Sequence, residues 1–289
     1  MKLILIHGRE QQDLDAAELR KTWLKALEIG MSKSNVSFPE NIEILFPYFG
    51  NFLDDLYQQV EEAMVRTGVV AKGHEAAMSQ TQYELLKELA QNARIPAVAL
   101  ADQTAIIREK GFLNLSPVQW LLQVLDDYTS IGKLTLETFT GDVSFYLDNA
   151  YPRNELNQFI AGVFEDDDDY VVVGHSLGSV IGYNVLHGLN KKRIRKYITV
   201  GSPLGLRTIR DKLAPPIRMP GCIRDGWYNA YDDRDVVALN PLDKLHFDIE
   251  PPIFNRNDVR NDTPNRHNIE GYLSDEGVAR AIYDALTGN

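Results

Sequence analysis

One serine in this sequence lies where an apolar strand passes into an apolar helix, between two glycines. Three valines lead into Gly174-His175-Ser176-Leu177-Gly178, and apolar residues then recur at nearly helical spacing. A strand-to-helix turn this short strains the serine backbone, and the glycines leave room for it. The pattern predicts that the Ser176 hydroxyl stands clear of a sheet as a nucleophile, with the Leu177 N–H facing any oxyanion that forms. The alternative is a structural serine in a buried connection.

A serine nucleophile needs a base, and three histidines follow Ser176 in the chain. His187 falls inside the expected helix, about three turns past its start, which is too far from the hydroxyl. His246 falls in an expected strand, which favours a packing or surface role. His267 lies in a polar loop just before the final expected helix, where a general base is well placed. We therefore expect His267 to be the base, against the alternative of an exposed loop histidine.

Three aspartates share the turn that should orient this histidine. Asp232, Asp233 and Asp235 follow the penultimate expected strand. Asp235 opens the run D-V-V-A-L-N-P, where the chain can turn beneath its carboxylate and hold it. We expect Asp235 to be the acid, and Asp232 and Asp233 are the alternatives, because aspartates in turns also bind backbone amides.

The oxyanion needs a second N–H donor, and the loop after the first expected strand is placed to supply it. Gly8 lets the backbone pass close to a substrate, so the N–H of Gly8 or of Arg9 is the expected donor. The Arg9 side chain would either meet an anionic group on the substrate or face solvent. No cofactor and no metal are expected, since the acidic run at 165–169 lacks the glycine and the spaced ligands of a calcium loop.

Alternating strand and helix signals predict the elements that bring these residues together. Continuous apolar runs, typical of strands buried in a parallel sheet, alternate with helical stripes. We expect an α/β fold with a mostly parallel central sheet of about six strands and helices on both faces. The expected strands are 3–7, 42–46, 170–174, 197–201, 227–231 and 245–250.

A long helical block interrupts this alternation. We divide the chain into a core, 1–50 and 151–289, and a mainly helical insert, 51–150. The insert leaves the sheet at the carboxyl end of the second strand, where ligands bind in such sheets, so we expect a lid or cap over the pocket. The alternative is a structural subdomain or a dimer surface. The residues expected to form an apolar wall around the substrate are Trp120, Leu121, Leu125 and Tyr128.

Single residues predict where several elements end. Gly30 is expected to end the first helix, Ser79 to precede a helix of the insert, and Ser116 to begin the next one as its N-terminal cap. Ser274 is expected to cap the closing helix. The basic segment 191–196 suits a helix end or a surface turn.

Composition narrows the class of protein. The formal net charge is −11 and no basic stripe is present to neutralise phosphates, which argues against a nucleic-acid binder. The single cysteine, Cys222, excludes an internal disulfide and agrees with a reducing compartment. The first residues lack the apolar stretch of a signal peptide, and no apolar run is long enough to span a membrane. We expect a cytoplasmic protein that acts on a small molecule.

Four motifs carry a resemblance to a known family. They are L-I-L-I-H-G at 3–8, V-V-V-G-H-S-L-G-S at 171–179, D-V-V-A-L-N-P at 235–241 and R-H-N at 266–268. With these motifs the chain resembles the α/β-hydrolase superfamily, in particular its lipase- and esterase-like serine hydrolases. The likeness covers the core strands, roughly two thirds of the chain, and not the insert. The usual first strands of the superfamily have no counterpart here, which implies a trimmed sheet.

The resemblance implies a triad of Ser176, Asp235 and His267 in that chain order. Lipases of this type carry the acid in a D-x-V-P-like turn, which supports Asp235, although alanine here replaces the proline. The segments 201–205 and 267–273 are also similar to bacterial members. The implied activity is cleavage of a carboxylic ester through an acyl-enzyme on Ser176. Alternatives are a thioesterase or an acyltransferase with the same residues, or a non-catalytic binding protein of this fold.

Overall fold

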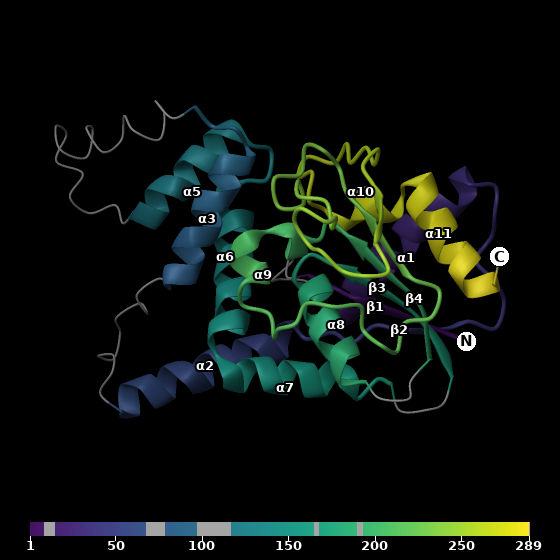
Figure 1. The fold of residues 1–289 in the computed structure, drawn as a ribbon, viewed down its shortest axis with the longest axis horizontal. Coiled ribbons are helices and arrows are strands. Elements are labelled where there is room, and N and C mark those ends of the chain that lie inside the picture. The colour runs from purple at the N-terminus through teal and green to yellow at the C-terminus, as the bar shows by residue number, and fades with distance from the viewer. Residues whose placement is uncertain (9–14, 68–78, 97–116, 165–167, 190–192, 289) are drawn as a thin grey trace.

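A six-stranded parallel sheet forms the centre of the protein in a computed structural model that describes residues 1–8, 15–67, 79–96, 117–164, 168–189 and 193–288 (Figure 1). Neighbouring strands run parallel throughout, in the order β2-β1-β3-β4-β5-β6. The expected α/β fold is therefore confirmed, and β3 lies inside the sheet between β1 and β4. The strands are β1 Lys2–Ile6, β2 Glu43–Leu45, β3 Asp169–His175, β4 Arg193–Val200, β5 Trp227–Ala230 and β6 Phe254–Arg256.

The last strand expected at 245–250 is wrong, because the sixth strand is β6, which pairs with β5. At the expected place the chain turns instead. The Asp243 carboxylate accepts hydrogen bonds from the backbone N–H groups of Leu245 and His246, each at 3.0 Å. Short polar side chains that bind nearby amides in this way favour a turn over a strand ladder.

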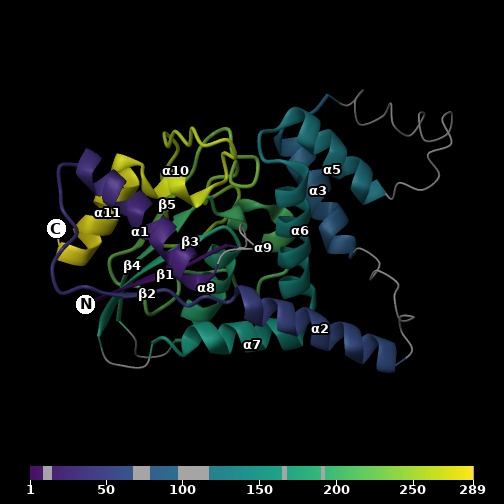
Figure 2. The same cartoon turned by 180° about the vertical axis from the view of Figure 1, so that it is seen from behind.

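Helices cover both faces of the sheet, and each face has its own hydrophobic core (Figures 1 and 2). Successive side chains of a strand point to opposite faces. Leu3 and Leu5 of β1 accordingly pack beneath α1 and α11, whereas Ile4 and Ile6 pack with α8 and the insert. The helices are α1 Ala16–Lys33, α2 Gly50–Arg66, α3 Gln80–Asn92, α5 Pro117–Tyr128, α6 Lys133–Asp148, α7 Ala150–Ala161, α8 Leu177–Gly188, η1 Pro203–Gly205, α9 Arg207–Arg210, α10 Ile269–Leu273 and α11 Glu276–Thr287.

Two of the helix ends expected in the first half of the chain lie within the described residues. Ser79 directly precedes α3, as expected, and its hydroxyl caps the helix by accepting from the backbone N–H of Gln82 at 3.1 Å. Gly30 does not end α1, which continues to Lys33. A Cβ on Gly30 would come within 2.3 Å of the Leu273 carbonyl oxygen, so this glycine allows α1 to pack closely against α10. Ser116 lies outside the described residues.

Two expectations in the second half are wrong. Asp275, not Ser274, caps α11, because its carboxylate accepts from the first free backbone N–H groups of the helix. The basic segment expected as a helix end or turn enters β4 at Arg193. Its charges suit a strand because Arg193 pairs with Asp169 at 3.0 Å and Arg195 is held by an acidic neighbour in the same way.

The described helices of the insert share one hydrophobic core with a face of the sheet. Leu85 of α3 and Leu122 of α5 belong to the same buried cluster as Val172 of β3. A carboxylate adds a polar tie, since Glu88 of α3 accepts from the backbone N–H groups of Arg207 and Thr208 at the start of α9. In both views α3, α5 and α6 stand at the end of the molecule away from the chain ends (Figures 1 and 2). Among the described helices, none has the length and apolar character needed to cross a membrane.

Candidate active site

Ser176 occupies a strained turn at the carboxyl end of β3. Its backbone has φ 51° and ψ −128°, outside the regions that side chains other than glycine favour. The neighbouring glycines make the turn feasible. A Cβ on Gly178 would come within 2.3 Å of the Ile6 carbonyl oxygen, and a Cβ on Gly174 within 2.8 Å of the Ser179 Cα. The turn therefore holds the serine at the edge of the sheet, directly before α8.

The structure brings Ser176, His267 and Asp235 into one hydrogen-bonded chain. His267 Nε2 lies 2.8 Å from the Ser176 Oγ, and His267 Nδ1 lies 2.7 Å from the Asp235 Oδ2. A carboxylate only accepts, so Nδ1 carries the proton and the lone pair of Nε2 faces the serine hydroxyl. Exposed fractions of 2%, 1% and 0% for Ser176, His267 and Asp235 remove all three groups from bulk water. A neutral imidazole placed in this way can take the hydroxyl proton.

Asp235 is held by donors other than the histidine. Its Oδ1 accepts from the backbone N–H of Val237 at 3.0 Å, so the chain turns beneath the carboxylate. Its Oδ2 accepts from the hydroxyl of Tyr272 at 2.7 Å, in addition to His267. Burial, followed by the negative charge of Asp235, raises the pKa of Tyr272 well above its ordinary value. The phenol therefore stays protonated and continues to donate.

Tyr272 carries no sequence motif of its own that predicts a role at the site. It lies on α10, five residues after His267, and its hydroxyl also accepts from the backbone N–H of Asp232 at 3.3 Å. The only signal was its place in the segment 267–273, where a motif match does not show which way a side chain points.

The two alternative acids have other partners. The Asp232 carboxylate accepts from the Arg234 guanidinium at 2.6 and 2.8 Å and from the backbone N–H of Asn261 at 2.7 Å. Burial opposes ionisation of Asp232, but hydrogen bonds from Arg234 and Asn261 outweigh it and lower the pKa. Asp233 is exposed and pairs with Arg260 at 2.9 Å. Asp232 thus ties two loops together, and Asp235 is the aspartate bonded to His267.

The chain after β1 passes directly against Ser176. A Cβ on Gly8 would lie 2.8 Å from the Ser176 Cβ, so a larger residue does not fit there. The Gly8 carbonyl is fixed by His7, whose Nδ1 lies 2.5 Å from it. His7 Nε2 accepts from the backbone N–H of Phe49 at 3.1 Å, and the two rings stack with centroids 4.0 Å apart. Arg9 lies outside the described residues. The Leu177 N–H is the first of α8, where helical N–H groups have no partner within the helix.

The other histidine of the motif supports the base through the backbone. His175 Nε2 lies 2.9 Å from the backbone carbonyl oxygen of His267. Because a carbonyl oxygen can only accept, the Nε2–H of His175 is the donor. Complete burial, followed by the charge of His267, lowers the pKa of His175 well below its ordinary value. His175 therefore stays neutral and steadies the loop that carries His267. The remaining histidines after Ser176 bind elsewhere, His187 at the Arg218 carbonyl and His246 at Asp243.

The insert reaches the site through α6. Phe139 of α6 presents its ring edge-on to His267, with centroids 5.9 Å apart. The four residues expected as a pocket wall are placed differently from one another. Leu121 and Leu125 are enclosed in the hydrophobic core, and Trp120 packs against that core. The indole N–H of Trp120 is buried and has no hydrogen-bond partner among the residues that the structure describes. Tyr128 is 55% exposed and lines a cleft between the insert and the sheet-end loops.

Comparison of the chain with protein-family models, with curated proteins and with solved structures gave no match. The chemistry of the site therefore rests on its own geometry. That geometry is a strained serine, a buried imidazole and a buried carboxylate, joined by two short hydrogen bonds.

Proposed function

We propose that this protein is a serine hydrolase of the α/β-hydrolase type that cleaves a carboxylic ester. The observation that carries the proposal is the unbroken chain of hydrogen bonds from Ser176 through His267 to Asp235 at the carboxyl end of β3. Structural serines in buried turns have no need of an oriented imidazole and a buried carboxylate behind it. The motif resemblance supports the same class.

The reaction follows from the positions of these groups. Ser176 Oγ attacks the ester carbonyl carbon while His267 Nε2 takes the hydroxyl proton, and the carbonyl electron pair moves to its oxygen. The Leu177 N–H and a donor of the loop after β1 stabilise this oxyanion. When the pair returns, the C–O bond of the alcohol breaks and the alkoxide takes the proton from His267. Water then attacks the acyl-enzyme in the same manner and releases the acid.

Asp235 and its partners act on the imidazole. The carboxylate holds Nδ1–H in place and stabilises the imidazolium that forms during each proton transfer. Because Val237 and Tyr272 fix the carboxylate from other directions, it cannot turn away as the charge develops. His175 restrains the backbone of the same histidine.

Substrate access requires part of the insert to move. Ser176 and His267 are nearly inaccessible, and Phe139 of α6 lies against the histidine ring. Opening of this contact is the route that we assign to an ester on its way to the hydroxyl. The proposal therefore includes α6 as the part of the insert that covers the site, in keeping with closure of active sites against water.

Labelling with a fluorophosphonate tests the proposal. The reagent should modify the native protein at Ser176, and replacement Ser176→Ala should abolish the label and lower hydrolysis of 4-nitrophenyl acetate by roughly 10⁴-fold or more. Ser179→Ala is the matched control, because Ser179 lies in the same motif and its hydroxyl bonds to Ser202 at 2.8 Å. Equal labelling of the native protein and the Ser176→Ala variant would refute the assignment.

A further inference from the structure

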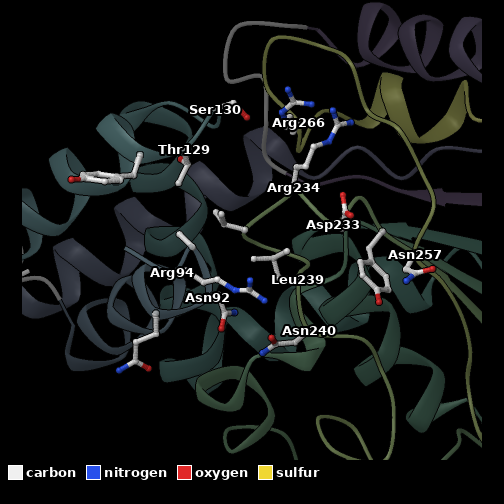
Figure 3. A pocket seen from close by; sticks show the side chains of 15 residues that line it. Asn92, Arg94, Thr129, Ser130, Asp233, Arg234, Leu239, Asn240, Asn257 and Arg266 are labelled. Atoms are coloured by element: carbon white, nitrogen blue, oxygen red, sulfur yellow. The ribbon is translucent and has the colours of Figure 1, made fainter. Parts of the chain in front are cut away.

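A large polar cleft lies between the insert and the loops that carry the acid and the base. Its volume is about 930 Å³, and its walls come from 91–94 at the end of α3, 128–130 at the end of α5, segments of the loop 231–240, and Asn257 and Arg266 (Figure 3). Figure 3 shows side chains from both sides of the cleft turned toward the space between them. Arg266 directly precedes His267 and Val236 directly follows Asp235, so the cleft borders the two loops of the triad.

The cleft is basic in a protein that is acidic overall. Three arginines, Arg94, Arg234 and Arg266, face it, against one acidic residue among its described lining, Asp233. Asp233 is already paired with Arg260. The chain as a whole carries a formal charge of −11, so a concave surface of the opposite sign is a local feature.

The three arginines differ in whether their guanidinium groups are paired with acidic side chains. Arg234 grips Asp232 with two nitrogens and reaches Asp262 at 3.2 Å. Arg266 lies 3.8 Å from the same Asp262. Within the described part of the chain, Arg94 has no acidic partner, and its side chain is exposed to the cleft. Its guanidinium is therefore available to an anion from outside.

The backbone conformation of Arg94 is an independent observation that points to use of its side chain. Arg94 has φ 53° just past the end of α3, where glycine is the residue that suffers no strain. In the described ranges, two of the other three non-glycine residues with positive φ are asparagines, which tolerate this conformation, and the third is Ser176 at the candidate nucleophile. Strain kept at an ordinary residue points to use of its side chain.

A second donor without a partner lies beside it. Among the described residues, the side-chain nitrogen of Asn92 is buried and has no hydrogen-bond partner, and Asn92 lines the same wall as Arg94. A buried donor left unsatisfied costs free energy, so such a group calls for an acceptor. An amide N–H and a guanidinium side by side form a donor set that fits the oxygens of a carboxylate or a phosphate.

We infer that this cleft binds the anionic part of the substrate, a carboxylate or phosphate group carried on the ester, with Arg94 and Asn92 as its donors. That the anion belongs to a substrate rests on the proposed function. Binding of the anion itself does not depend on catalysis. An anionic group, and not the apolar chain expected from the sequence, is therefore the occupant that we assign to this cleft. Arg234 and Arg266 line the same cleft and contribute positive potential to it.

Calorimetric titration tests binding without any turnover. Glutarate and inorganic phosphate are titrated separately, at constant ionic strength, into the full-length Ser176→Ala protein. We expect saturable binding of at least one probe, and the tighter of the two identifies the group as carboxylate or phosphate. Adding Arg94→Gln should weaken that binding tenfold or more. Arg20→Gln, at an exposed arginine of α1 remote from the cleft residues in sequence, is the control for the lost charge. Equal effects of the two replacements, or no binding at millimolar concentrations, would overturn the inference.

Kinetics link the cleft to the substrate. The ratio of kcat/KM for mono(4-nitrophenyl) glutarate to that for 4-nitrophenyl butyrate should fall tenfold or more with Arg94→Gln and stay constant with Arg20→Gln. An unchanged ratio in a protein that fluorophosphonate labels at Ser176 overturns the substrate assignment while leaving the hydrolase proposal intact. Absent labelling with retained, Arg94-dependent anion binding refutes the hydrolase and keeps the anion site.

Discussion

At the scale of single residues, the carboxylate of Asp235 divides its hydrogen bonds among three donors. One oxygen serves the backbone of Val237, and the other serves both His267 and Tyr272. A donor that shares the oxygen facing the histidine withdraws negative charge from that contact. Tyr272 therefore moderates the pairing of acid and base in addition to holding the carboxylate.

Replacing Tyr272 by phenylalanine should change the pH dependence of catalysis in a defined direction. Without the phenol, the Asp235 oxygen stabilises the imidazolium more strongly, so the inactive protonated form persists to higher pH. The acid limb of the kcat/KM profile for 4-nitrophenyl acetate should move to higher pH, with a loss at neutral pH of about three- to tenfold. Tyr183→Phe removes a buried phenol that donates to the Arg218 carbonyl and serves as the control. A uniform loss at every pH would contradict the moderating role.

The residues near the nucleophile also show which parts of a site a sequence can predict. Strand, turn and helix around Ser176 follow one another directly, from Asp169 to Gly188, so their geometry follows from local pattern. Asp235 follows from its position after a strand signal, and His267 from its place in a polar loop before the last helix. The contacts of Tyr272, His175 and Phe139 do not, because each depends on the packing of elements far apart in the chain. Hydrophobic periodicity predicts which face of a helix is buried, but not which element packs against that face.

At the scale of elements, the end of α3 combines a strained backbone with a side chain that faces the cleft. The residue after a helix cap is often glycine in the left-handed region, and here it is Arg94. The preceding residue, Ala93, has φ −65°, which any residue adopts. Two adjacent positions therefore respond oppositely to the same replacement.

Arg94→Gly should stabilise the protein by about 1 kcal/mol, because glycine relieves the left-handed strain. Ala93→Gly should destabilise it by roughly 0.5–1 kcal/mol, because there glycine only adds freedom to the unfolded chain. Urea unfolding at neutral pH measures both. Gain of stability with loss of anion binding in Arg94→Gly would mark a position where binding is favoured over folding. A loss of stability equal to that of Ala93→Gly would contradict the strain argument.

The contact between α6 and His267 makes a separate prediction. Phe139→Ala removes the ring of α6 that lies on His267 and leaves a space there. Labelling by a bulky fluorophosphonate should become about tenfold faster, while the free energy of unfolding falls by roughly 3 kcal/mol. Phe145→Ala, on the same helix and stacked on Tyr57, supplies the control for lost stability alone. Equal acceleration in both variants would attribute the effect to general loosening.

Some elements escaped prediction for physical reasons that the structure makes plain. The short edge strand β6 has three residues and no apolar alternation, whereas the apolar segment before it is a turn held by Asp243. The local pattern at Gly30 predicts a helix end. The structure shows instead that a glycine is required there because α1 packs closely against α10. In both places tertiary contacts outweigh the local signal.

At the scale of the whole molecule, the buried carboxylate of Asp232 ties the loop after β5 to the loop before α10. Asp232 joins Arg234 and the backbone of Asn261, and its pKa lies below its ordinary value. The folded protein therefore binds this proton less readily than the unfolded chain does. The resulting stability is present above the unfolded pKa of about 3.9 and is lost as pH falls through the lower folded pKa.

Asp232→Asn should lower the free energy of unfolding at pH 7 by about 2 kcal/mol, since hydrogen bonds to a charged group are lost. The variant should also lose less stability than the native protein as pH falls below about 4. Urea unfolding at pH 7, 5, 4 and 3 gives both values. Asp233→Asn, at the exposed neighbour, should follow the native curve. Parallel curves for the native protein and Asp232→Asn would show that this carboxylate does not contribute to acid sensitivity.

Burial of Ser176, together with the contact of Phe139 on His267, would set an upper limit on how fast any reagent can act. If the hydroxyl is reached only after α6 opens, opening is a unimolecular event with its own rate constant. At high reagent concentration the observed rate then levels off at that constant, however reactive the reagent is. Two fluorophosphonates of different intrinsic reactivity would converge on the same plateau. The packing of a single phenylalanine would in this way determine how often the chemistry beneath it can begin.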